Sequence, residues 1–144
     1  AKVDEVSWID DSKATNPHSA QAALLANLNV IWIAGGLAKG AKMDELIINC
    51  KQRIKAAILI GQDRDLIVQA LKQHAPQIPI SLIDADSPAS IMEKVVKKAS
   101  EIAQPNDTVL LAPACASMDQ FKSYAQRGDL FASAVKSNLK LANV

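Results

Sequence analysis

Five short apolar runs separated by longer amphipathic segments are the feature that most limits the fold of this chain. The runs are four to six residues long, are bounded by Gly, Pro, Asp or Asn, and read VSWI, VIWIA, AAILIG, ISLID and TVLLAP. Runs of this length and composition predict buried strands. Because such strands need cover on both faces, the pattern favours a mostly parallel sheet between two layers of helices.

The segments between the runs have the period of amphipathic helices. In residues 87–104 the apolar side chains fall on one face, with Ser87 as the cap and Pro88 as the first helical residue. Similar stripes predict helices at 63–74 and 43–54, and Asn16-Pro17 predicts the start of another. The 144 residues show no linker or repeat and predict one domain, whose tail, 136–144, is compatible with a helix or a frayed end.

Composition argues against several classes of protein. The net charge is +1 without a basic stripe and aromatic residues make up 3%, which does not suit nucleic-acid binding. Cys50 and Cys115 lack metal-ligand spacing, so they favour a reducing, cytoplasmic setting over a disulfide scaffold, and no signal peptide is expected. The apolar stretch 22–38 contains Asn27, Asn29 and a Gly pair, and therefore predicts a helix followed by a strand rather than a membrane span.

Polar side chains follow the first run, where an open α/β sheet binds ligands. The run delivers Asp10 and Asp11 to the sheet edge, and the loop 12–15 that follows contains Lys13 and Thr15. A carboxylate can accept hydrogen bonds from a sugar diol, and a lysine beside a helix N-terminus can hold an anion. An ordinary capped loop with a solvated lysine is the alternative that this loop alone leaves open.

The loop after the second run reads AGGLAKGAKMD. Gly35 and Gly36 allow a sharp turn, and Lys39 is expected at the same sheet edge. A glycine-rich loop with a lysine suggests phosphate binding, but neither the Walker A pattern nor the dinucleotide fingerprint G-x-G-x-x-G occurs in the chain. A flexible turn with surface lysines is the alternative.

The third polar loop lies in the segment LLAPACASMDQFKSYAQRG. Ser117, followed three residues later by Gln120, predicts a capping box and a helix that begins at Met118, with free N–H groups suited to a carboxylate. Cys115 is a conceivable nucleophile, but neither histidine has a recognisable placement as its base. We therefore expect Cys115 to be a small buried thiol.

In this order, the segments DDSKATNP, GGLAKG and LLAPACASMDQFKSYAQRG resemble the C-terminal domain of the Mur ligase family of peptidoglycan synthesis, in the group that adds D-glutamate. The resemblance covers nearly the whole chain. It implies that residues 1–144 form a Rossmann-like three-layer α/β domain, with a mostly parallel sheet of five to six strands, usually six with one antiparallel, and helices on both faces. The N-terminal UDP-binding and central ATPase domains of such a ligase lie outside these residues.

The resemblance also implies an ATP-dependent, ADP-forming amide ligase. The L-alanine carboxylate of UDP-N-acetylmuramoyl-L-alanine would become an acyl phosphate, which the amine of D-glutamate would then attack. ATP and Mg²⁺ would be held mainly by the central domain, so this domain alone would bind D-glutamate and part of ATP without turnover. The implied partners are these substrates and the other two domains, with no nucleic acid and no membrane.

Individual residues take roles from the same resemblance. Asp11 matches a contact to the ATP ribose, Lys13 a catalytic lysine near the phosphate, and Lys39 a lysine that pairs with a D-glutamate carboxylate. The other matched D-glutamate positions are Thr15, Ser117, Met118 through its backbone N–H, and Tyr124. Tyr124 falls where some members have phenylalanine, so its hydroxyl departs from the pattern. No residue is matched to a metal.

Two other classes of function are alternatives to a ligase domain. A receiver-type signalling domain needs a phosphoacceptor aspartate at the end of the third strand and a lysine after the fifth. Here the third run leads into Gln62 and Asp63, which reads as a helix cap, and no lysine follows the fifth run in APACAS. A stand-alone Rossmann-type small-molecule or partner-binding module would hold its ligand tightly by itself, whereas a ligase fragment would bind D-glutamate weakly.

Overall fold

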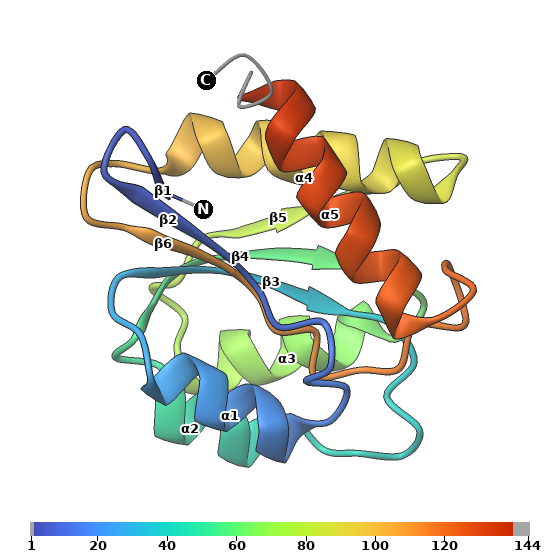
Figure 1. Ribbon diagram of the computed structural model, residues 1–144. Helices are drawn as coiled ribbons and strands as arrows, with labels where there is room; N and C mark the ends of the chain where they lie inside the picture. Colours follow the sequence, from blue (N-terminus) through green and yellow to red (C-terminus); the bar gives the residue numbers. More distant parts are fainter. Residues whose placement is uncertain (1, 140–144) are drawn as a thin grey trace.

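The computed structural model describes residues 2–139 of the chain. Within this range a six-stranded sheet has the order β1-β2-β6-β3-β4-β5 (Figure 1). All neighbouring strands are parallel except β1, which is antiparallel to β2. The predicted mostly parallel sheet is therefore confirmed. The strands are β1 (Lys2–Val3), β2 (Val6–Asp10), β3 (Val30–Gly35), β4 (Ile54–Ile60), β5 (Ile80–Leu82) and β6 (Thr108–Leu111).

Helices cover both faces of the sheet, as expected for a three-layer domain (Figure 1). On one face lie α1 (Pro17–Leu25), α2 (Asp44–Cys50) and α3 (Arg64–His74). On the other lie α4 (Pro88–Ile102) and α5 (Tyr124–Asn138). The tail is helical as far as Asn138, and residues 140–144 lie outside the described residues. Of the helices between residues 2 and 139, none combines the length and apolar character that crossing a bilayer requires.

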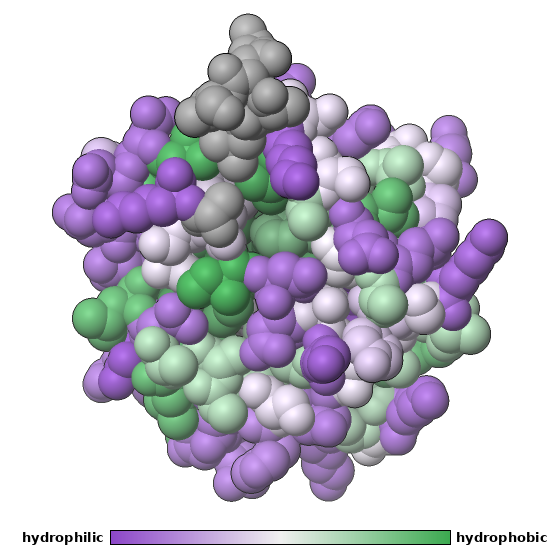
Figure 2. Space-filling model, viewed as in Figure 1, coloured by the Kyte–Doolittle hydropathy of each residue, from purple (hydrophilic) through white to green (hydrophobic). Residues whose placement is uncertain are grey.

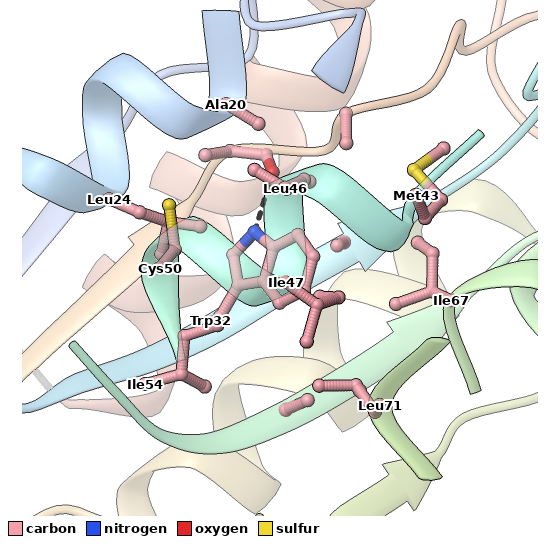
Figure 3. Close-up of a cluster of buried hydrophobic side chains, with 14 of the residues drawn as sticks. Ala20, Leu24, Trp32, Met43, Leu46, Ile47, Cys50, Ile54, Ile67 and Leu71 are labelled. Carbon is pink, nitrogen blue, oxygen red and sulfur yellow. Dashed lines mark hydrogen bonds between the residues drawn. The ribbon is translucent and has the colours of Figure 1, made fainter. Parts of the chain in front are cut away.

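The central strands are buried on both sides, which explains their continuous apolar sequences. Every residue of β3 and of β6 is buried. Successive residues point to opposite faces, so Trp32 packs with α1, α2 and α3 while Ile33 packs with α4 and α5. The indole Nε1 of Trp32 donates to the carbonyl oxygen of Ala112 at 2.8 Å, which satisfies its one polar atom within the apolar layer (Figure 3).

The surface seen in Figure 2 is mixed in character. Hydrophilic residues are spread over this face, and apolar residues form smaller groups between them. The large exposed apolar side chains of the described residues include Leu28, between α1 and β3, and Met118, in the loop after β6. Scattered apolar side chains of this kind are normal on a protein surface.

Two helix starts agree with the sequence, and one helix end does not. The side chain of Asn16 accepts from Ser19 N at 2.9 Å, and that of Ser87 accepts from Ser90 N at 3.2 Å, as N-caps should. The helix predicted for 43–54 ends at Cys50, because Ile54 already belongs to β4. Ile54 lies in the same apolar layer as the buried residues of α2, but it belongs to the strand. The helical spacing of apolar residues therefore extends past the turn at which the helix ends, which made the predicted helix too long.

The predicted capping box at Ser117 is wrong. Residues 117–121 form a turn in which the N–H groups of Gln120 and Phe121 both donate to the carbonyl oxygen of Ser117. The helix begins instead at Tyr124, where the Ser123 hydroxyl accepts from Gln126 N at 3.0 Å. The S-x-x-Q pattern occurs at both places, and the buried Phe121 keeps the first copy in a turn against the core.

Candidate binding site at the carboxyl edge of the sheet

The loops that follow β2, β3 and β6 lie side by side, because these strands are parallel and adjacent. Ala114 N donates to the carbonyl oxygen of Ala14 at 2.8 Å, which joins the loops after β6 and β2. Leu37 and Ala116 exchange two backbone hydrogen bonds of 2.9 Å, which join the loops after β3 and β6. The three loops singled out in the sequence therefore form one continuous surface.

The loop after β2 is held by backbone hydrogen bonds and by the Asp10 carboxylate, with Ser12 buried and Lys13 exposed. Asp11 N donates to the carbonyl oxygen of Leu111 at 2.8 Å, and the Asp10 carboxylate accepts from Ser12 N at 3.0 Å. Ala14 is buried, whereas its neighbour Lys13 is exposed. Asp11 and Thr15 are half-buried at the same edge.

The loop after β3 turns sharply through its glycine pair. Gly36 has φ +137°, and a Cβ there would lie 2.2 Å from the carbonyl oxygen of Ala116. The close contact between the two loops thus requires glycine. Lys39, two residues beyond Leu37, is exposed and has a left-handed φ of +51°.

The loop after β6 supplies the remaining predicted positions. Ser117 is buried and Met118 is 64% exposed, both in the 117–121 turn rather than at a helix N-terminus. The backbone N–H of Met118 forms no hydrogen bond with any of residues 2–139. Tyr124 is half-exposed as the first residue of α5, so the helix N-terminus lies at this later position.

Five polar side chains at this edge have no hydrogen-bond or ion-pair partner among the described residues. Within residues 2–139 they form no hydrogen bond or ion pair with one another or with any other side chain or backbone group. They are those of Asp11, Lys13, Thr15, Lys39 and Ser117. Two cations, two hydroxyls and one carboxylate on three joined loops thus have no internal partner among the described residues. The two lysines are exposed, whereas Ser117 is buried.

Comparison with known proteins places the chain in a family. A family profile described as "Mur ligase, glutamate ligase domain" matches residues 1–115. The chain belongs to the Mur ligase family. It is 52% identical over 136 residues to the UDP-N-acetylmuramoylalanine--D-glutamate ligase of Streptomyces coelicolor. It is 51% identical over 134 residues to the protein of the same name from Leifsonia xyli.

This Mur ligase chain matches only part of each relative. The aligned region covers 94% of the chain and 29% of the Streptomyces coelicolor protein, and 93% and 26% for the Leifsonia xyli protein. Among solved structures, UDP-N-acetylmuramate-alanine ligase from Thermotoga maritima matches with a TM-score of 0.55 and 13% identity. That match covers 94% of this chain and 28% of the other, and it supports the Rossmann-like α/β fold.

One residue of the site was missed in the sequence. Arg127 of α5 has no exposed surface, and its Nη2 donates to the carbonyl oxygens of Cys115 at 3.0 Å and Ser12 at 3.4 Å. Burial lowers the pKa of the guanidinium to about 10, although Cys115, Asp119 and Asp10 oppose that shift. In the sequence, its burial could have been suspected only from the position of this arginine beside the glycine of YAQRG, among the apolar residues of a helix.

Cys115 is the small buried thiol that the sequence predicts. Burial raises its pKa to about 12, against the opposing charge of Arg127 and with smaller contributions from Asp63 and Asp119. A thiol that stays protonated at neutral pH is a poor nucleophile. Cys115 therefore contributes packing rather than covalent chemistry to this edge.

The described residues do not form a metal centre. Between residues 2 and 139, no group of three or more His, Cys, Asp or Glu side chains is arranged to hold a metal ion.

Proposed function

We propose that this chain is the D-glutamate-binding C-terminal domain of a UDP-N-acetylmuramoyl-L-alanine--D-glutamate ligase of peptidoglycan precursor synthesis. One observation carries the proposal. The side chains of four residues form no hydrogen bond or ion pair within residues 2–139 and lie on three loops that are hydrogen-bonded to one another; they are Lys13, Thr15, Lys39 and Ser117. The Streptomyces coelicolor and Leifsonia xyli relatives, both named as D-glutamate ligases, support the choice of substrate. Because the chain spans 29% of the first relative, we also propose that the UDP-binding and ATPase domains belong to the rest of a longer protein.

The chemistry of D-glutamate suits this edge. The amino acid has two carboxylates and one amine, so its recognition needs cations and hydrogen-bond donors at fixed separations. Lys39 would pair with one carboxylate, and Ser117 with the backbone N–H of Met118 would bind the other. Thr15 and Tyr124 would complete the site, and the exposed Tyr124 ring would cover one side of the ligand.

The loop after β2 would contact the nucleotide. Asp11 would accept hydrogen bonds from the ATP ribose, and Lys13 would place its charge near the transferred phosphate. In the intact ligase the L-alanine carboxylate would attack the γ-phosphate, releasing ADP and leaving an acyl phosphate. The D-glutamate amine would then attack the acyl carbon, and phosphate would leave as the amide bond forms.

The part played by this domain would be positioning. Two polyanions and an amine must be held together, and a domain that carries two lysines on rigid loops can close over substrates held elsewhere in the enzyme. Mg²⁺ would then be bound outside these residues. The proposed setting is the cytoplasm, in keeping with two buried cysteines that form no disulfide with each other.

Titration of this chain with D-glutamate, followed through its backbone amide resonances, tests the proposal. We expect weak binding that shifts the amides of Thr15, Lys39 and 117–124, with smaller shifts for L-glutamate. Equal shifts for both enantiomers, shifts confined to another face, or no shifts at all would contradict D-glutamate recognition by this edge. Tight binding by the chain alone would favour a stand-alone binding module instead.

A further inference from the structure

Asp63 stands before α3, where the sequence predicts a helix cap, but its side chain forms no cap hydrogen bond. Its Oδ2 atom accepts instead from the backbone N–H of Ala38 at 2.8 Å. Its own N–H donates to the carbonyl oxygen of Gly36 at 2.9 Å. Asp63 therefore holds the loop after β3 at residues on both sides of Leu37.

The hydrogen bond from Ala38 N to Asp63 holds the residue directly before the exposed Lys39. Leu37 is fixed to Ala116 by two hydrogen bonds, and Ala38 is fixed by the Asp63 carboxylate. Lys39 follows at once, with a left-handed φ of +51°. The backbone of Lys39 itself forms no hydrogen bond with residues 2–139, so the direction in which its side chain leaves the loop depends on Ala38.

A second carboxylate links the same turn to the loop after β6. Asp119 Oδ2 accepts from the backbone N–H of Gln62 at 2.8 Å. Gln62 and Asp63 are consecutive. Gln62 is hydrogen-bonded to the 117–121 turn, and Asp63 is hydrogen-bonded to the loop after β3, which carries Lys39. The turn between β4 and α3 therefore supports the spacing between Lys39 and Ser117, in addition to the direct hydrogen bonds between Leu37 and Ala116.

The placement of these carboxylates is unfavourable for binding an anion and needs an explanation. A negative charge near an anion site lowers the affinity for the anion, so chemistry alone would favour a neutral acceptor there. A hydrogen bond from a backbone N–H to a carboxylate is stronger and better fixed than one to a neutral oxygen. Rigid placement of the loop is the benefit that offsets the unfavourable charge.

We propose that Asp63 is a positioning residue for D-glutamate recognition, which fixes the backbone of Ala38 so that Lys39 is held at a set distance from Ser117. This inference rests on the proposed function, in which Lys39 pairs with a carboxylate of D-glutamate. Asp63 touches no substrate in this arrangement. Its effect passes through the loop that carries Lys39.

The test compares substitutions at Asp63 in the intact ligase that contains this domain. Asp63→Ala should raise the KM for D-glutamate about tenfold, because Lys39 is then no longer held in place for its ion pair with the ligand carboxylate. The kcat and the KM for ATP should change by less than about twofold. Asp63→Asn keeps an acceptor for Ala38 N and should restore the KM for D-glutamate. Asp65→Ala, on the exposed first turn of α3, is the matched control and should behave like the wild type.

A double-mutant cycle with Lys39→Ala separates positioning from general loss of structure. If Asp63 acts through Lys39, then adding Asp63→Ala to Lys39→Ala should raise the KM by less than about twofold. Fully additive effects, or equal losses for all three substrates, would overturn the positioning role. If Lys39→Ala raises the KM for D-glutamate and Asp63→Ala does not, the positioning role fails alone. If Lys39→Ala has no effect, the proposed function fails first.

Discussion

The fully buried guanidinium of Arg127 donates from Nη2 to the carbonyl oxygen of Cys115 at 3.0 Å. The same nitrogen reaches the carbonyl oxygen of Ser12 at 3.4 Å. These two carbonyls belong to the loops after β6 and β2, next to Ser117 and Lys13. The helix α5 thus holds two loops of the candidate site through one buried side chain.

Arg127→Met should destabilise the chain by about 2 to 4 kcal/mol, because it leaves two buried carbonyl oxygens without a donor. The free energy of unfolding in urea measures the change. Arg64→Met is the control. Arg64 pairs with the exposed Asp84 and donates to the carbonyl oxygen of Ile83 at 3.0 Å, but it is partly exposed, so water can replace it and the loss should be about 1 kcal/mol. An equal effect of the two substitutions would contradict the role assigned to Arg127.

Gly61→Ala should be far more damaging than Gly40→Ala. Both glycines have positive φ, +90° and +81°, so both substitutions carry a similar backbone strain. A Cβ at Gly61 would lie 2.4 Å from the backbone nitrogen of Gly36, whereas nothing lies within 4 Å of one at Gly40. We expect Gly61→Ala to cost about 3 kcal/mol more than Gly40→Ala in urea unfolding. Equal costs would show that Gly61 serves only as a turn.

Stability above pH 9 should depend on Cys115. Burial raises its pKa from the usual 9.0 to about 12, so over this range the unfolded chain loses the thiol proton first. Stability therefore falls as pH rises, by up to about 1.4 kcal/mol per pH unit for this group. The lowered pKa of Arg127, about 10, acts in the opposite direction as the pH approaches and passes 10.

Urea unfolding of Cys115→Ala between pH 9 and 10 checks this dependence. The variant should start less stable than the wild type, and the difference should shrink across the window. A difference that stays constant from pH 8 to pH 10 would contradict the raised pKa. Cys50 keeps its own contribution in both proteins and so cancels in the comparison.

Two serines of the same segment should separate stability from function. Ser123→Ala removes the N-cap of α5 and should cost about 1 kcal/mol in urea unfolding. Ser117→Ala removes no hydrogen bond among residues 2–139 and should cost less than about half of that. In the intact ligase Ser117→Ala should instead raise the KM for D-glutamate. The reverse pattern would restore the capping role that the sequence first suggested for Ser117.

The predictable parts of the fold are those in which local sequence and burial agree. The strands around Trp32 and Leu110 are continuous apolar runs because both faces are covered. Asn16-Pro17 and Ser87-Pro88 could be read as helix starts because each supplies its own cap. The error at Ser117 arose because the chain contains two copies of one local pattern. The copy at Ser123 forms the cap, with Gln126 also accepting from Lys122 N, while Phe121 beside the first copy is buried in the core.

Other features depend on contacts between segments distant in sequence. The strand β1 forms through a turn at Asp4 and Glu5, both with positive φ. Asp is common in such turns but Glu is not, so the pair is a weak sequence signal for a hairpin. Asp63 looks like a cap because its partner, Ala38, is 25 residues away. Arg127 looks like a surface cation until the fold brings Ser12 and Cys115 to it. The loops of the site were visible in the sequence, but the groups that fix them were not.

The most direct test of the central claim is the KM for D-glutamate of the intact ligase with Lys39→Ala, compared with Lys42→Ala. Both lysines are exposed in the loop after β3, so the pair controls for charge and for disturbance of the loop. Lys39→Ala should raise the KM for D-glutamate by about tenfold or more, whereas Lys42→Ala should change it by less than about twofold. An unchanged KM for Lys39→Ala, or equal changes for both variants, would contradict binding of D-glutamate at this edge.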